Sequence, residues 1–84
     1  MIRKFIKKNK IIFENGTRNS SIVTLIGYAL YLELEKEELK KELEYEINND
    51  YFIQDEIDRL WGYCEGRNYG DWWKTEKAKS LYKF

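Results

Sequence analysis

An uncharged run from Asn19 to Leu32 constrains the fold of this chain more than any other feature of the sequence. Apolar residues recur in this run at the spacing of an α-helix, and further apolar residues cover much of the remaining circumference. The run is shorter than the ~20 apolar residues that a membrane-spanning helix needs. We therefore expect a helix that is buried at the centre of a soluble domain.

Two further helical patterns follow this run. The first lies in residues 35–50, where a narrow apolar stripe predicts a helix on the surface: Leu39, Leu43 and Ile47. The second has acidic residues in its first turn, ends at Gly66 and places five residues on one face: Ile53, Ile57, Leu60, Trp61 and Cys64. Glycines inside helical patterns, at Gly27 and Gly62, indicate close packing of helices.

The two ends of the chain are less well defined. Residues 10–14 are compatible with a strand or with the last turn of an N-terminal helix built on Ile2, Phe5 and Ile6. Residues 70–84 favour a fourth helix with Asp71 as its N-cap, and a short hairpin is the alternative. A chain of 84 residues has room for one domain. We expect an all-α or mostly α domain, with a basic segment 1–15, a helical core 16–66 and a basic aromatic segment 67–84.

The formal net charge of zero conceals a strong segregation of charge along the chain. Residues 1–18 carry six Lys/Arg and one acidic residue. Residues 33–58 carry three Lys/Arg and eleven acidic residues, and residues 59–84 carry six Lys/Arg and three acidic residues. The three blocks therefore have net charges of +5, −8 and +3. Basic ends favour an anionic partner, whereas the acidic middle does not.

Catalytic and metal-binding roles find little support. The chain has no histidine, and its one cysteine, Cys64, lies on an apolar helix face without an activating cation. Four acids cluster without the regular spacing of a metal-binding loop: Asp50, Asp55, Glu56 and Asp58. We expect neither an enzyme nor a cofactor. A single cysteine and an N-terminus without the pattern of a signal peptide favour a cytoplasmic protein.

Basic and aromatic residues gather near the C-terminus, and single-stranded nucleic acids are bound by cations that contact phosphates and aromatic rings that stack on bases. The candidates are Arg67, Tyr69, Trp72, Trp73, Lys74 and Lys77. Adjacent tryptophans on a helix point in different directions, so we expect one of the two to be buried and the other accessible. A second set of possible phosphate contacts lies near the N-terminus, together with Arg3: Lys4, Lys7, Lys8 and Lys10.

The segment before the central run offers a further candidate site. Gly16 opens a turn, and Asn19 or Ser20 is a suitable N-cap for the helix that follows. Arg18 beside a helix N-terminus predicts a site for a phosphate. The alternative is that Arg18 pairs with Glu14 or with an acid of the second helix.

Residues 12–66 resemble the small helical domains found C-terminal to the catalytic part of many plasmid and phage primases, the primase C-terminal (PriCT-type) domains. Such domains begin with a Gly-x-Arg-Asn turn, continue through an asparagine-containing loop and end in a helix that starts with a hydrophobic residue, two polar residues, Glu and an aliphatic residue. The matching positions are Gly16, Arg18 and Asn19 in the turn, Asn48 or Asn49 in the loop, and Ile53, Glu56 and Ile57 in the last helix. The prolines common in the family's loop are missing.

The resemblance implies a free-standing accessory protein that binds single-stranded DNA and assists a separate primase, polymerase or helicase in the replication of a plasmid, phage or other mobile element. Arg18, Asn19 and the C-terminal basic and aromatic residues would then contact DNA. The alternative is a small protein that modulates a protein partner through the acidic residues Glu38, Glu42 and Glu46. A helix-turn-helix regulator is disfavoured because the third helix is acidic at the end that would meet the bases.

Overall fold

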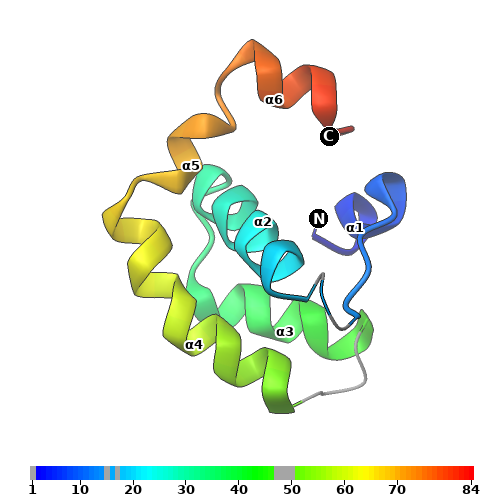
Figure 1. Cartoon of the computed structure of the whole chain (residues 1–84), viewed down its shortest axis with the longest axis vertical. Helices are drawn as coiled ribbons and strands as arrows, with labels where there is room; N and C mark the ends of the chain where they lie inside the picture. The colour runs from blue at the N-terminus through cyan, green and yellow to red at the C-terminus, as the bar shows by residue number, and fades with distance from the viewer. Residues whose placement is uncertain (1, 15, 17, 47–50) are drawn as a thin grey trace.

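The fold, seen in a computed structural model, is all-α across the residues that the structure describes, which are 2–14, 16, 18–46 and 51–84. These residues form six helices and no strand (Figure 1): α1 (Ile2–Asn9), α2 (Arg18–Tyr31), α3 (Lys36–Glu46), α4 (Tyr51–Gly66), α5 (Tyr69–Trp72) and α6 (Glu76–Leu81). The predicted all-α class is confirmed. Helices α2, α3 and α4 are the three that the sequence predicted.

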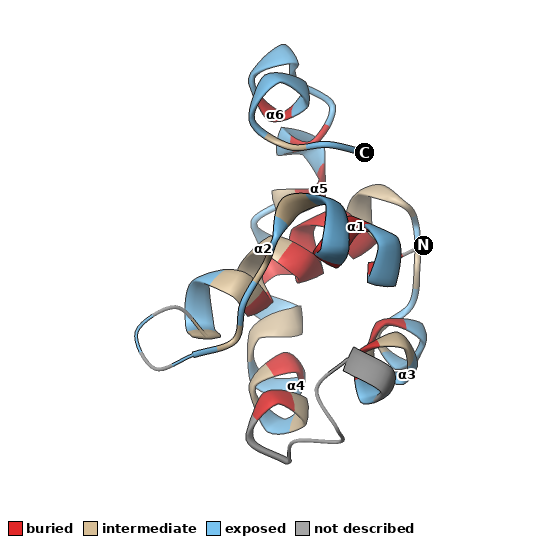
Figure 2. Ribbon diagram, turned by 90° about the vertical axis from the view of Figure 1, so that its right-hand side faces the viewer, coloured by how far each residue is buried: buried red, intermediate tan, exposed pale blue. Residues whose placement is uncertain are grey.

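Helix α2 lies at the centre of the molecule, as Figure 2 shows by its burial. It packs against α3, α4 and α5, so that apolar side chains are needed on most of its circumference. Four of its residues have no exposed surface: Ile22, Leu25, Ile26 and Ala29. This packing on several sides explains the uncharged run and confirms the prediction of a buried central helix.

Helices α3 and α4 each contribute one apolar face to the same core. Leu39 and Leu43 of α3 are fully buried, as predicted, while Ile47, Asn48 and Asn49 lie outside the described residues. On α4, Ile53, Ile57 and Cys64 are buried, and Leu60 and Trp61 pack partly buried against them. Burial raises the pKa of the Cys64 thiol, which keeps the group protonated at neutral pH.

Helices α1 and α2 end with the same backbone geometry. In α1 the N–H of Ile11 donates to Ile6 O (3.1 Å) and the N–H of Lys10 to Lys7 O (3.4 Å). In α2 the N–H of Leu34 donates to Ala29 O (2.9 Å) and that of Glu33 to Leu30 O (3.1 Å). Both ends are Schellman motifs, with Lys10 (φ 51°) and Glu33 (φ 62°) in the left-handed conformation that glycine prefers.

This ending of α1 corrects both expectations for residues 10–14. The left-handed Lys10 stops the helix, and residues 11–14 have no regular secondary structure. The segment is therefore neither a strand nor the last turn of the helix. The alternative of an N-terminal helix built on Ile2, Phe5 and Ile6 is confirmed for residues 2–9, because all three side chains are buried.

The C-terminal tail forms two short helices rather than the one helix or hairpin expected. Asp71 is not an N-cap, because its own N–H already donates to Asn68 O (3.0 Å) within α5. The N-cap of α6 is Thr75, whose side chain accepts from Ala78 N (3.3 Å). Gly70 places α5 directly on α2, since a Cβ at this position would lie 3.0 Å from Leu30 Cβ.

The C-terminus of the chain lies beside the last residues of α1 (Figure 1). Asn9 Nδ2 donates to Lys83 O (2.8 Å), and Asn9 Oδ1 accepts from the N–H of Lys83 (2.7 Å). Lys8 Nζ donates to Phe84 O (3.0 Å). Beneath these contacts the ring of Phe5 stacks on Tyr82 and lies edge-on to Trp73. The basic N-terminal segment and the basic aromatic tail are thus one structural unit.

Candidate nucleic-acid interface

A hollow lined by aromatic rings lies between α2 and the C-terminal tail. Its volume is about 340 Å³, and we call it the aromatic hollow; it is lined by Val23, Thr24, Gly27, Tyr69, Trp72, Trp73 and Tyr82. Three of the predicted nucleic-acid contacts, Tyr69, Trp72 and Trp73, therefore come together here. Rings and apolar side chains form most of its wall, which suits a planar ligand better than a charged one.

The two adjacent tryptophans differ as predicted. Trp72 is 38% exposed, whereas Trp73 is 3% exposed and lies among the rings of Phe5, Tyr28 and Tyr82. The two indole planes are nearly perpendicular, with centroids 5.1 Å apart. The prediction that Trp73 stacks on a base is corrected, because only 3% of its surface is exposed.

The N–H edge of Trp73 lies against Gly27 of α2. A Cβ added at Gly27 would lie 2.8 Å from Trp73 Nε1, so residue 27 must be glycine for this approach. The close packing predicted at Gly27 is confirmed. The same prediction is wrong for Gly62, where a Cβ would meet no atom within 4 Å.

A second hollow adjoins the first and is more polar. Its volume is about 300 Å³, and we call it the polar hollow; it is lined by Asn9, Lys10, Ile11, Ile12, Ser20, Ser21, Thr24 and Tyr82. Thr24 and Tyr82 belong to both hollows, so the two lie side by side. Lys10, one of the predicted phosphate contacts, is exposed here next to hydroxyl groups from the first turn of α2.

The other predicted cations of the two ends lie on exposed surface. Lys4 and Lys7 are exposed on α1, and Lys77 is exposed on α6. The ammonium group of Lys8 donates to Phe84 O. The contact between Asn9 and Lys83 uses only the backbone of Lys83, whose side chain is exposed beside the end of α1.

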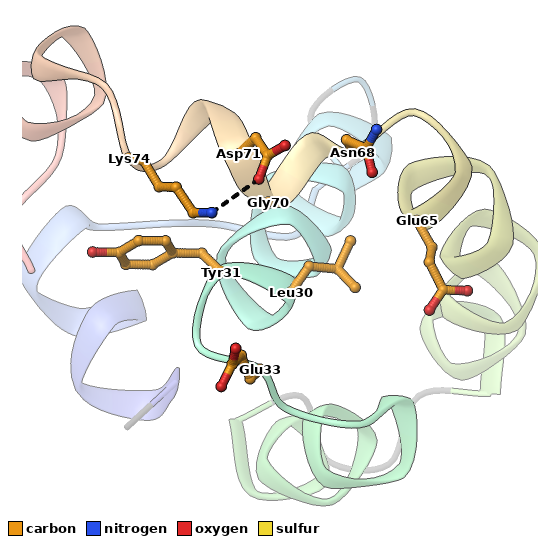
Figure 3. A pocket seen from close by; sticks show the side chains of 8 residues that line it. All are labelled: Leu30, Tyr31, Glu33, Glu65, Asn68, Gly70, Asp71 and Lys74. Atoms are coloured by element: carbon orange, nitrogen blue, oxygen red, sulfur yellow. Dashed lines mark ion pairs between the residues drawn. The ribbon is translucent and has the colours of Figure 1, made fainter.

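Two predicted cations lie elsewhere. The guanidinium of Arg67 lies over the ring of Tyr63, 4.7 Å from its centroid. Lys74 pairs with Asp71 (3.2 Å) in a hollow of about 220 Å³, which Figure 3 shows. This hollow also presents the carboxylates of Glu33 and Glu65, so that acids outnumber the one lysine. Such a site disfavours a phosphate.

The predicted site at the start of α2 differs from expectation in two respects. The helix begins at Arg18, whose N–H donates to Glu14 O (2.8 Å), so neither Asn19 nor Ser20 is the N-cap. Arg18 and Asn19 line a hollow of about 190 Å³ together with Gly16 and Glu56. Glu56 from α4 thus lines the place where a phosphate was expected. This acid belongs to α4, whereas the alternative named Glu14 or an acid of the second helix as the partner of Arg18.

Two of the acids considered as a partner surface have roles within the fold. Glu42 Oε1 accepts from the N–H of Ile2 (2.9 Å) and of Arg3 (3.4 Å), which caps α1 with a negative charge from another helix. Glu38 Oε1 accepts from the N–H of Glu35 (3.2 Å), as in a capping box. The side chain of Glu46 lies outside the described residues. Capping explains why like charges stand one turn apart on α3.

The acids considered for metal binding are paired with cations. Asp58 accepts a hydrogen bond from Lys40 (3.0 Å) and lies 3.3 Å from Lys36. The hydrogen bond from Lys40 is the main reason that the pKa of Asp58 lies below its ordinary value of 3.8. Asp55 and Glu56 both pair with Arg59, and Asp50 lies outside the described residues. Among the described residues no cluster of acids, cysteine or histidine could hold a metal ion.

The structure therefore adds residues that sequence reasoning did not select: Asn9, Thr24, Gly27, Tyr82 and Lys83. Gly27 carried a signal in the sequence, because glycine inside a helical pattern is costly without a packing reason.

In the part of the chain that the structure describes, no helix combines the length and the apolar character needed to cross a bilayer. Comparisons with protein-family models, curated proteins and solved structures found no match.

Proposed function

We propose that this chain binds single-stranded DNA on the face where its two basic ends meet. The observation that carries the proposal is the contact of Asn9 with Lys83, which brings the end of α1 beside the end of the chain. The contact uses the side-chain amide of Asn9 and the backbone of Lys83. The side chains of Lys10 and Lys83 are therefore both exposed, although their segments lie side by side. Cations held on one face attract a phosphate backbone.

A single strand fits this face better than a duplex. Trp72 exposes 38% of its surface at the aromatic hollow, and Tyr82 forms the wall shared with the polar hollow. Bases of a duplex are stacked on one another, whereas those of a single strand offer their faces to aromatic side chains. Exposed lysines beside accessible rings are the combination that sequence-tolerant binding of single strands requires.

The resemblance to primase C-terminal domains supports a role in replication. We propose that the chain acts without catalysis, as an accessory to a separate primase, polymerase or helicase of a mobile element. The absence of histidine and the burial of the only thiol, Cys64, agree with a binding role.

The proposal is tested by fluorescence-anisotropy titration of a labelled single strand, and of a duplex of matching sequence, at several salt concentrations. We expect the single strand to bind more tightly and its affinity to fall steeply with salt. No binding to either DNA at low salt would refute the proposal.

Two double variants with the same change in charge sharpen this test. In Lys10→Gln with Lys83→Gln, we expect the salt slope to fall by about 0.7 for each phosphate that the protein no longer neutralises. The matched control is Lys74→Gln with Lys79→Gln, because these lysines pair with Asp71 and Glu76. Equal slopes in the two variants would show that the joined ends are not the binding face.

A further inference from the structure

We propose that the two adjoining hollows hold one nucleotide of the strand, with its base in the aromatic hollow and its phosphate beside Lys10 in the polar hollow. This inference rests on the proposed binding of single-stranded DNA and specifies its site. It starts from the shared wall: Thr24 and Tyr82 line both hollows, so a ligand can occupy the two together.

The aromatic hollow has the size and shape for a single base. Its volume of about 340 Å³ is near the lower end of the range of small-molecule sites, about 300–1,000 Å³. The ring of Trp72 stands nearly perpendicular to those of Trp73 and Tyr82, at angles of 88° and 82°. Trp72 is 38% exposed and lines the hollow, so its indole is accessible for stacking with a base.

An indole N–H in its wall suits this hollow to a ligand with an acceptor. Trp73 is only 3% exposed, and none of the described residues accepts a hydrogen bond from its Nε1. This N–H lies against Gly27 in the wall of the aromatic hollow. An indole N–H donates to an acceptor placed next to it. Ring nitrogens and carbonyl groups on the edge of a nucleobase supply one, whereas an aliphatic ligand does not.

The polar hollow supplies the complementary group for the phosphate. Lys10 is exposed there, and Ser20 adds a hydroxyl from the first turn of α2. Lys10 also keeps a left-handed backbone (φ 51°) that glycine would adopt without strain. The backbone at this position would favour glycine, so the charge of the lysine side chain is the reason that we infer for its presence.

The test compares an oligothymidylate with an abasic strand of the same length and label, using the full chain and anisotropy. We expect the oligothymidylate to bind about tenfold more tightly than the abasic strand, because the stacking of one base on an aromatic ring contributes a gain of this size. In Thr24→Leu, which fills the shared wall, and in Trp72→Ala, we expect this difference to vanish while the affinity for the abasic strand stays unchanged. Lys10→Gln should weaken binding of both strands equally.

Leu81→Ala is the matched control, because Leu81 is 62% exposed and lines neither hollow; it should leave both affinities unchanged. If Thr24→Leu loses helicity by circular dichroism, the surface variant Trp72→Ala decides. Equal, salt-sensitive binding of both strands by the unaltered chain would overturn the nucleotide site and leave DNA binding intact. Failure of both strands to bind would refute the proposed function itself.

Discussion

The acidic helices and the basic ends of this molecule use their charged groups differently. On α3 and α4 the acids hold the structure together: Glu42 caps α1, Glu38 caps α3, and Asp58 binds Lys36 and Lys40. At the basic ends the two segments are joined by the amide of Asn9, by the backbone of Lys83 and by one ammonium group, that of Lys8. The ammonium groups of Lys4, Lys7 and Lys10 are exposed there.

This difference shows why net charge was a poor guide to the site. A run of acids looked like a binding surface, yet two of its members act as caps inside the fold. The cations at the two ends are far apart in sequence, yet Asn9 joins their segments. Charge that stabilises the fold cannot be used freely for a partner, whereas charge left on the surface can.

The largest effect should come from separating the two basic ends. Asn9→Ala removes three hydrogen bonds, to Phe5 O, to Lys83 O and from Lys83 N–H. We expect a loss of about 2 kcal/mol in the free energy of unfolding. We also expect weaker binding of a single strand, because the cations no longer share a face. Urea denaturation and anisotropy measure the two effects, and unaltered DNA affinity in a folded Asn9→Ala protein would contradict the joined-face account.

A smaller loss is expected on the acidic side. Glu42→Ala removes the acceptor for the N–H groups of Ile2 and Arg3, and we expect a loss of about 1 kcal/mol, as for other N-terminal caps. Glu44→Ala is the matched control, because Glu44 is exposed on the same helix. Thermal denaturation of both variants checks this prediction. Equal stabilities would show that Glu42 does not act as a cap.

The two left-handed residues provide a paired prediction. Both Lys10→Gly and Glu33→Gly relieve a strained backbone, and we expect each to stabilise the fold by roughly 1 kcal/mol or less. Only Lys10→Gly should weaken binding of single-stranded DNA, because only Lys10 lines the polar hollow. Melting temperatures and anisotropy report the two effects. Equal DNA affinity in the two variants would refute a phosphate contact at Lys10.

The smallest effect is a dependence of stability on pH. The pKa of Asp58 is lowered by Lys40 and Lys36, so its contribution is present at neutral pH and is lost as the pH falls through this lowered pKa, below 3.8. The side chain is 44% exposed, so we expect only a few tenths of a kcal/mol. Asp58→Asn should therefore destabilise at pH 7 and not at acid pH. Urea titrations at both pH values measure this, and an equal loss at both would exclude the charge as the cause.

Periodicity predicted the core helices because their apolar faces are local patterns. The uncharged run, the stripe of Leu39 and Leu43, and the face of Ile53 and Ile57 all map onto α2, α3 and α4. The ends were predicted less well. Lys10 stops α1 in a conformation that favours glycine, and Thr75 caps α6 where Asp71 was expected.

The candidate site was predicted only in part because it depends on contacts distant in sequence. Tyr69 and Trp72 were found from composition, and the burial of one tryptophan from helix geometry. The contact of Asn9 with Lys83 spans the chain and leaves no local pattern. The same holds for Glu56, which lines one hollow with Arg18 only because α4 packs near the start of α2.

The most direct test of this account is a titration of the ¹⁵N-labelled chain with an unlabelled oligothymidylate, followed by amide chemical shifts. We predict changes at Lys10, at Ser20 and Thr24, and at the indole N–H of Trp73. We predict none on the exposed side of α3, at Glu37 and Glu44. Shift changes confined to Arg18, Asn19 and α3, or to the hollow around Lys74, would contradict it.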